Sequence, residues 1–130
     1  MRAWWRKRYS VLVVDDEPDI RAVVKSILEP GPFDPIWEAA DGETALQIAF
    51  GQQPDLIVLD YHMPGMDGEA VANGLKLISS GTRVLVLTSV MKEPPPWGHG
   101  FLDKLDIARL PGVLELMVKD RPERRRRRDD

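Results

Sequence analysis

Short apolar runs alternate along the chain with longer segments that mix apolar and polar residues. We predict strands on the apolar runs, at residues 9–14, 36–40, 55–59, 83–87 and 100–103. The first segment between them places Ile20, Val23, Val24, Ile27 and Leu28 at the spacing of an amphipathic helix. Further helices are predicted over residues 43–50, 69–79 and 106–120, with Pro111-Gly112 bending or delaying the first turn of the last one.

This order of elements predicts an α/β fold. The strands show little alternation of apolar and polar residues, so both faces of the sheet should be covered by helices, as in a parallel sheet. Five strands favour a flavodoxin-like, doubly wound parallel sheet with strand order 2-1-3-4-5. In that order strands 1 and 3 are neighbours, and the functional site is expected beyond their carboxyl ends.

The connection between the fourth and fifth strands is unusually short. Only residues 89–100 separate Thr88 from Phe101, and they contain Pro94-Pro95-Pro96, which cannot continue a helix. We therefore expect the helix between strands 4 and 5 to be shortened or missing, with Trp97 packing over that side. A dozen extended residues reach about 40 Å, so the crossover can still close.

Composition narrows the class of protein further. A chain of 130 residues is expected to form one domain with short extensions. It has no cysteine, which excludes disulfides and thiolate metal sites. Its apolar runs are too short to span a bilayer, and residues 1–9 lack the apolar stretch of a secretory signal.

The basic residues gather at the two ends of the chain. Residues 11–120 hold 8 basic and 18 acidic side chains, a net charge of −10, so we expect no nucleic-acid binding through the folded domain. The predicted organisation is a basic and aromatic extension at 1–8, a folded domain at 9–120 and a charged, disordered tail at 121–130. Binding of an anionic partner by either end stays open as an alternative.

Three acidic residues follow the strands that should be neighbours. Asp15 and Asp16 end the first strand and Asp60 ends the third, so their carboxylates should converge and repel one another. Mg²⁺ would relieve that repulsion, because it binds carboxylate and phosphate oxygens. Thr88 adds a hydroxyl after the fourth strand, and Lys104 adds a positive charge suited to phosphate after the fifth.

Each of these residues also has an ordinary structural explanation. An acidic pair before a helix usually interacts with the helix dipole, and an aspartate at a strand end is usually a turn residue. Thr88 alone is a capping hydroxyl and Lys104 alone a solvated lysine. Their joint placement at one edge of the predicted sheet favours a site for phosphoryl chemistry.

Four stretches of the chain, taken in order, resemble the receiver domain of two-component response regulators. They are Val11-Leu-Val-Val-Asp-Asp-Glu-Pro18, Asp60-Tyr-His-Met-Pro-Gly-Met-Asp-Gly68, Leu87-Thr-Ser89 and Gly100-Phe-Leu-Asp-Lys104. The resemblance spans about residues 9–120, nearly all of the expected folded domain.

This resemblance implies a role for each candidate residue. Asp60 would be the phosphoacceptor. Asp16 and Asp60 would bind Mg²⁺ directly, Asp15 would act mainly through a bound water, and the backbone carbonyl of His62 would complete the protein ligands.

The resemblance also implies how the phosphoryl group is held and sensed. Thr88 and Lys104 would hold the phosphoryl oxygens, and Phe101 would be a switch aromatic that turns inward when Thr88 moves. The shortened crossover leaves open whether residues 91–100 order on phosphorylation or form a fixed docking unit.

The expected function is that of a cytoplasmic switch. It would accept its phosphoryl group from a histidine kinase or a histidine phosphotransfer protein and act on an unknown downstream protein, without turning over a separate substrate. One alternative is a degenerate receiver that works as an interaction module with little switching. A second is a phosphatase of the haloacid dehalogenase type, but that family needs Asp-x-Asp and here Glu17 stands two places after Asp15.

Overall fold

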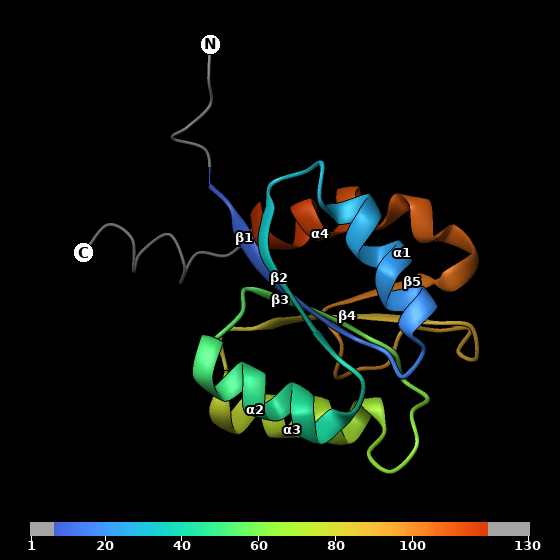
Figure 1. Ribbon diagram of the computed structural model, residues 1–130. Helices are drawn as coiled ribbons and strands as arrows, with labels where there is room; N and C mark the ends of the chain where they lie inside the picture. The colour runs from blue at the N-terminus through green and yellow to red at the C-terminus, as the bar shows by residue number, and fades with distance from the viewer. Residues whose placement is uncertain (1–6, 120–130) are drawn as a thin grey trace.

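A parallel sheet lies between two layers of helices in the computed structural model, which describes residues 7–119 (Figure 1). The strand order is β2-β1-β3-β4-β5, and every neighbouring pair is parallel. The strands are β1 (Tyr9–Val14), β2 (Phe33–Ala39), β3 (Leu56–Leu59), β4 (Arg83–Thr88) and β5 (Gly100–Asp103). The predicted fold class and strand order are confirmed.

Helices cover both faces of the sheet. One face packs on α1 (Pro18–Leu28) and α4 (Leu110–Lys119), and the other packs on α2 (Gly42–Gln52) and α3 (Gly68–Ile78). The central strands bury aliphatic side chains on both sides. On the α1 and α4 side these include Val11, Val13, Leu56, Val58, Leu85 and Leu87, and on the α2 and α3 side Leu12, Val14, Ile57, Leu59, Val84 and Val86. This double burial explains why the strands read as continuous apolar runs.

Acidic side chains start the two helices on the α2 and α3 side. Asp41 accepts a hydrogen bond from the backbone N–H of Thr44 at 2.7 Å, and Asp67 accepts one from that of Ala70 at 3.0 Å. Such caps satisfy backbone donors that the first turn of a helix leaves unpaired. Asp67 therefore fixes the start of α3 at the end of the loop that follows Asp60.

The second strand begins earlier than the sequence predicts. It starts at Phe33 rather than at residue 36, and it contains Pro35, which cannot donate a ladder hydrogen bond. β2 lies at the edge of the sheet, where proline is tolerated. The register with β1 also shifts, between the pair formed by Tyr9 and Phe33 and the pair formed by Val11 and Ile36.

The last helix begins at Leu110 rather than at residue 106, in line with the bend or delay predicted at Pro111-Gly112. A 3₁₀ helix (Lys104–Arg109) comes first, and the backbone of Asp106 inside it is not helical, with φ −104° and ψ 26°. α4 then begins at Leu110, so Pro111 falls in its first turn, where a missing N–H costs no hydrogen bond. The predicted end at residue 120 lies outside the described residues.

No helix lies between β4 and β5, which confirms the prediction for this part of the described chain. Residues 89–99 form turns and bends instead. Pro95 is buried, and Met91 and Trp97 pack with Phe101 against the apolar cluster on the α2 and α3 side. The loop thus covers the face of β4 and β5 that a crossover helix would cover, and Trp97 packs there as predicted.

Nowhere in residues 7–119 is there a helix with the length and apolar character needed to cross a membrane. The predictions for most of the basic extension and for the charged tail fall on residues 1–6 and 120–130, outside the described residues.

Candidate functional site

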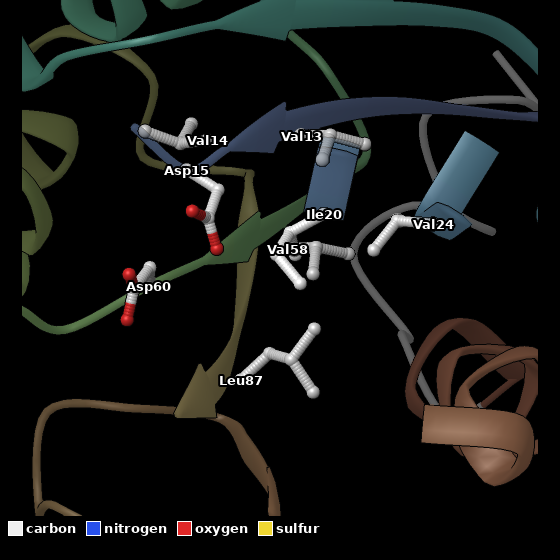
Figure 2. Close-up of a pocket in the computed structure, with 8 residues that line it drawn as sticks. All are labelled: Val13, Val14, Asp15, Ile20, Val24, Val58, Asp60 and Leu87. Atoms are coloured by element: carbon white, nitrogen blue, oxygen red, sulfur yellow. The ribbon is translucent and has the colours of Figure 1, made fainter. Parts of the chain in front are cut away.

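Asp15 and Asp60 lie side by side because β1 and β3 are paired up to their last residues. Val14 is opposite Leu59, and the backbone N–H of Asp60 donates to the carbonyl of Val14 at 3.0 Å. Figure 2 shows the two carboxylates beyond the ends of these strands. Carboxylate oxygens of Asp15, Asp16 and Asp60 lie within 4.8 Å of one another. The predicted cluster is therefore present.

The three carboxylates differ in their access to solvent. Asp15 is 3% exposed and Asp60 6% exposed, whereas Asp16 is open to solvent. Two carboxylates thus lie at the bottom of the site and the third at its rim. A hydrated cation could reach the cluster from the side of Asp16 and still keep several waters, as Mg²⁺ usually does.

The start of α1 holds Asp15 in place. Its side chain accepts a hydrogen bond from the backbone N–H of Glu17 at 2.9 Å. Its backbone carbonyl accepts one from the guanidinium of Arg21 at 2.7 Å. Arg21 is itself fixed by Glu38 of β2 at 3.0 Å. These contacts leave the second oxygen of Asp15 directed toward Lys104.

The loop after Asp60 folds back on itself. The backbone N–H of His62 donates to a side-chain oxygen of Asp60 at 3.3 Å, and the N–H of Gly68 donates to the carbonyl of Tyr61 at 2.9 Å. Gly65 lies between them with φ +87°, a conformation that favours glycine. The turn at Pro64-Gly65 therefore positions the residues on either side of it.

Within the described part of the chain, one ammonium group forms ion pairs with the carboxylates. Lys104, directly after β5, places its Nζ 3.2 Å from Asp15 and 3.5 Å from Asp60. The lysine side chain is 19% exposed, so both ion pairs are shielded from bulk water. One positive charge for three carboxylates leaves the site with an excess of negative charge.

The pKa shifts reflect this imbalance. Burial raises the pKa of Asp60, and the charge of Asp15 raises it further, against the lowering effects of Lys104 and of the His62 N–H. Burial alone would lower the pKa of Lys104, but the charges of Asp60 and Asp15 outweigh it and raise the pKa. The ionised form of Asp60 is therefore disfavoured without a further cation, and this donor set fits a divalent metal ion.

Thr88 ends β4, the strand that pairs with β3, and Phe101 lies in β5, which pairs with β4 on its other side. Thr88 is buried at the end of β4, and its hydroxyl accepts a bond from the N–H of Val90 at 3.2 Å. Phe101 pairs with Val86 in the sheet and is partly buried on the α2 and α3 side. The structure thus brings Asp15, Asp16, Asp60 and Lys104 together and leaves the Thr88 hydroxyl in its own turn.

Behind the carboxylates the site is closed by apolar side chains. The space there has no room for a water molecule. It is lined by Val13, Val14, Asp15, Ile20, Val24, Val58, Asp60 and Leu87, all drawn in Figure 2. This apolar floor accounts for the burial of Asp15 and Asp60 and confines any ligand to the solvent side.

One contact beside the site could not be predicted from the sequence. The rings of Tyr61 and Trp97 are stacked, with centroids 6.2 Å apart and an angle of 22° between their planes. A tryptophan in a short crossover predicts packing, but nothing in the local pattern indicates its partner 36 positions earlier in the chain.

Comparison with known proteins agrees with the fold. The family model of the response regulator receiver domain matches residues 11–95. The chain belongs to the response regulator receiver domain family. The predicted resemblance is therefore confirmed.

Individual relatives extend the match beyond that region. The chain is 30% identical over 109 residues to sporulation initiation phosphotransferase F of Bacillus subtilis, covering 84% of this chain and 80% of that protein. It is 35% identical over 80 residues to the nitrate/nitrite response regulator NarL of Escherichia coli K12, covering 61% of this chain and 37% of that protein. The chain spans less than two thirds of the length of most of these relatives.

Solved structures show the same fold. The chemotaxis protein CheY4 of Vibrio cholerae superposes with a TM-score of 0.74 at 29% identity, over 85% of this chain and 98% of that one. The response regulator domain of CheB from Thermotoga maritima superposes with a TM-score of 0.75 at 26% identity, over 87% of this chain and 96% of that one.

Proposed function

We propose that this chain is a signalling switch that accepts a phosphoryl group on Asp60 with the help of Mg²⁺. The observation that carries the proposal is the placement of Asp60, buried between Asp15 and Lys104 at the edge of the sheet. A buried carboxylate among like charges, open to solvent on one side, suits a nucleophile that works with a metal ion.

The metal site would use the acidic cluster. In this proposal Asp16 and Asp60 bind Mg²⁺ directly, Asp15 acts mainly through a bound water, and the backbone carbonyl of His62 completes the protein ligands. Carboxylate oxygens within 4.8 Å of one another support this assignment. When bound, Mg²⁺ offsets the charge on the phosphoryl oxygens.

The transfer itself needs a nucleophile and a leaving group in line. A carboxylate oxygen of Asp60 attacks the phosphorus of a phosphohistidine on the donor protein, and the bond from phosphorus to the imidazole nitrogen breaks. The imidazole leaves with the bonding electron pair, and Asp60 becomes an acyl phosphate. Lys104 is already 3.5 Å from Asp60 and would hold a phosphoryl oxygen.

Thr88 would hold a second phosphoryl oxygen. Its hydroxyl now accepts a hydrogen bond from Val90, and as a donor it would have to turn toward Asp60. Phe101, which packs on the same side of the sheet as the β4–β5 loop, would respond to that movement as the switch aromatic.

The partners follow from this chemistry. The phosphoryl donor would be a histidine kinase or a histidine phosphotransfer protein, and the output would pass to a separate protein. The name of the phosphotransferase relative, 80% of which this chain covers, supports a role in phosphoryl relay. The proposal places the chain in the cytoplasm, where ATP supplies kinases. A degenerate receiver is not favoured, because all five side chains proposed for the site are present. They are Asp15, Asp16, Asp60, Thr88 and Lys104.

The first experiment measures phosphorylation by intact mass. The full chain is incubated with acetyl phosphate and Mg²⁺, and the mass of one added phosphoryl group is expected. Asp60→Asn should abolish the addition. Asp67→Asn is the matched control in the same loop, because asparagine can still cap α3. Equal labelling of Asp60→Asn and the parent would show that the acceptor is a different residue.

The second experiment tests the metal. Mg²⁺ at millimolar concentration should raise the melting temperature, because it binds only the folded arrangement of carboxylates. Asp16→Ala should remove most of that increase. Asp19→Ala, which removes an exposed carboxylate in the first turn of α1, should keep it. A parent whose melting temperature ignores Mg²⁺ would contradict the proposed metal site.

A further inference from the structure

The stacked pair of Tyr61 and Trp97 joins two loops that phosphorylation would affect. Tyr61 directly follows the proposed acceptor Asp60, and Trp97 belongs to the loop at residues 89–99 that stands in place of a crossover helix. Both side chains also pack against the apolar cluster on the α2 and α3 side. The contact is therefore anchored on the sheet.

Gly68 makes this close packing possible. A Cβ at Gly68 would lie 2.9 Å from the Cα of Tyr61 and 3.4 Å from Cη2 of Trp97. The backbone N–H of Gly68 also donates a hydrogen bond to the carbonyl of Tyr61. This bond closes the acceptor loop, residues 61–68, which follows Asp60. Trp97 thus lies against both ends of the acceptor loop, at Tyr61 and at Gly68.

The β4–β5 loop is held differently at its two ends. At its far end the N–H of His99 donates to the carbonyl of Val84 at 2.8 Å, and the N–H of Val84 donates to Nδ1 of His99 at 2.8 Å. At its near end the N–H of Val90 donates to the hydroxyl of Thr88. The contact at Val90 uses the Thr88 hydroxyl, which a phosphoryl group on Asp60 would bind. Phosphorylation would therefore release the loop at Val90 and leave it attached at His99.

We propose that Trp97 is a positioning residue whose stacking on Tyr61 couples occupancy of the Asp60 site to the conformation of residues 89–99. This coupling rests on the proposed function. It makes residues 89–99 the segment whose conformation changes when Asp60 is phosphorylated. A ligand in the Asp60 site acts on residues 89–99 through Thr88 and through the backbone of Tyr61. Trp97 links the change at Thr88 to the change at Tyr61. Such coupling is reciprocal in binding, so removing the ring must also change the affinity of the site for its ligands.

The first test makes Trp97 the reporter. In the full chain, Trp4, Trp5 and Trp37 are replaced by phenylalanine, which leaves Trp97 as the only tryptophan. Its fluorescence should change when Mg²⁺ is added alone, and again when beryllofluoride is added as a phosphoryl mimic. The control keeps Trp37 of β2 as the only tryptophan, and its fluorescence should stay constant. An unchanged Trp97 signal with ligand bound would overturn the proposal.

The second test measures affinity. Trp97→Ala should weaken Mg²⁺ binding by about two- to tenfold, the factor that corresponds to the loss of one aromatic pair. Trp97→Phe retains a ring and should restore most of the affinity, which a general loss of stability would not explain. Phe50→Ala removes an exposed aromatic side chain on α2 and serves as the control. Parent-like affinity in Trp97→Ala would contradict the coupling.

The third test follows hydrogen exchange in residues 89–99 while intact mass reports the label on Asp60. Exchange should change on phosphorylation in the parent and in Trp97→Phe, and should not change in Trp97→Ala. If Trp97→Ala does not fold, Trp97→Leu takes its place. If Trp97→Ala is fully labelled on Asp60 and still shows the exchange change of the parent, the coupling through Trp97 is refuted and the proposed function is not. A parent that takes no label would refute the proposed function, while the Mg²⁺ measurements still decide the coupling.

Discussion

The ammonium of Lys104 lies 3.2 Å from a carboxylate oxygen of Asp15, closer than its 3.5 Å approach to Asp60. In the metal-free site the lysine is therefore shared between the proposed acceptor and Asp15. It already faces the position where a phosphoryl group on Asp60 would be, so little movement is needed to bind that group.

Lys104→Met tests this arrangement. Removing the ammonium leaves two buried carboxylates without their cation, which should lower the metal-free free energy of unfolding by about 1–3 kcal/mol. The increase in melting temperature on adding Mg²⁺ should become larger, because the ion then offsets more repulsion. Lys76→Met changes an exposed lysine on α3 and should do neither. Urea denaturation with and without Mg²⁺ measures both effects.

Asp60→Asn should stabilise the metal-free protein at neutral pH. Burial and the charge of Asp15 raise the pKa of Asp60 in the folded state, so that state holds the proton more tightly than the unfolded chain does. Stability is then lost as pH rises through the raised pKa, and asparagine avoids that loss. The melting temperature should rise by several degrees at pH 7.5.

The advantage of Asp60→Asn should shrink on acidification and vanish below the ordinary carboxyl pKa of 3.8, where the aspartate is protonated in both states. It should also shrink in saturating Mg²⁺, which favours the ionised parent. A variant less stable than the parent at pH 7.5 without metal would show that Lys104 already balances the charges.

Gly68→Ala should destabilise the domain and disturb the acceptor loop. The new Cβ would lie 2.9 Å from the Cα of Tyr61, which is backbone and cannot move without shifting the residue after Asp60. We expect a loss of about 1–3 kcal/mol, as for overpacking in a core, together with weaker Mg²⁺ binding.

Gly51→Ala provides the control for this change. Gly51 lies in α2, and a Cβ there would meet nothing within 4 Å. Alanine should stabilise that helix by about 0.5–1 kcal/mol and leave Mg²⁺ affinity unchanged. If both variants show the same stability and affinity, the close packing of Gly68 on Tyr61 does not constrain the site.

Local signals predicted the parts of the fold and site that matter most for chemistry. Asp15 and Asp60 could be placed together because each ends a strongly apolar run, and parallel neighbours bring such ends to one edge. The start of β2 was missed because Pro35 argues against a strand unless the strand is known to be at an edge. The late start of the last helix was expected from Pro111-Gly112, but the 3₁₀ helix before it was missed because nothing in the local pattern marks Asp106 as non-helical.

Contacts between distant segments could not be predicted in this way. The stacking of Trp97 on Tyr61 depends on how the β4–β5 loop crosses the sheet, and the hydrogen bond from Val84 to the His99 ring depends on a side chain taking a backbone position. Both features lie in the segment where this chain lacks the expected crossover helix. The three consecutive prolines predicted that the helix there is shortened or missing, but not which contacts take its place.

The ring of His99 takes the place of a backbone hydrogen-bond acceptor beside β4. Val84 is 3% exposed, and its N–H donates to Nδ1 of His99 just before the pairing of β4 with β5 begins at Leu85. His99→Ala would leave this buried donor without a partner, at a cost of about 1–3 kcal/mol. Amide exchange at Val84 should also become faster, which heteronuclear NMR can measure residue by residue.

Two further variants separate the lost acceptor from the lost ring. His99→Asn offers a carbonyl oxygen near the position of Nδ1 and should recover most of the stability and the slow exchange of Val84. His62→Ala removes an exposed imidazole in the acceptor loop and should leave Val84 unaffected. If His99→Asn is as unstable as His99→Ala, then packing of the ring, rather than its hydrogen bond to Val84, holds the β4–β5 loop on the sheet.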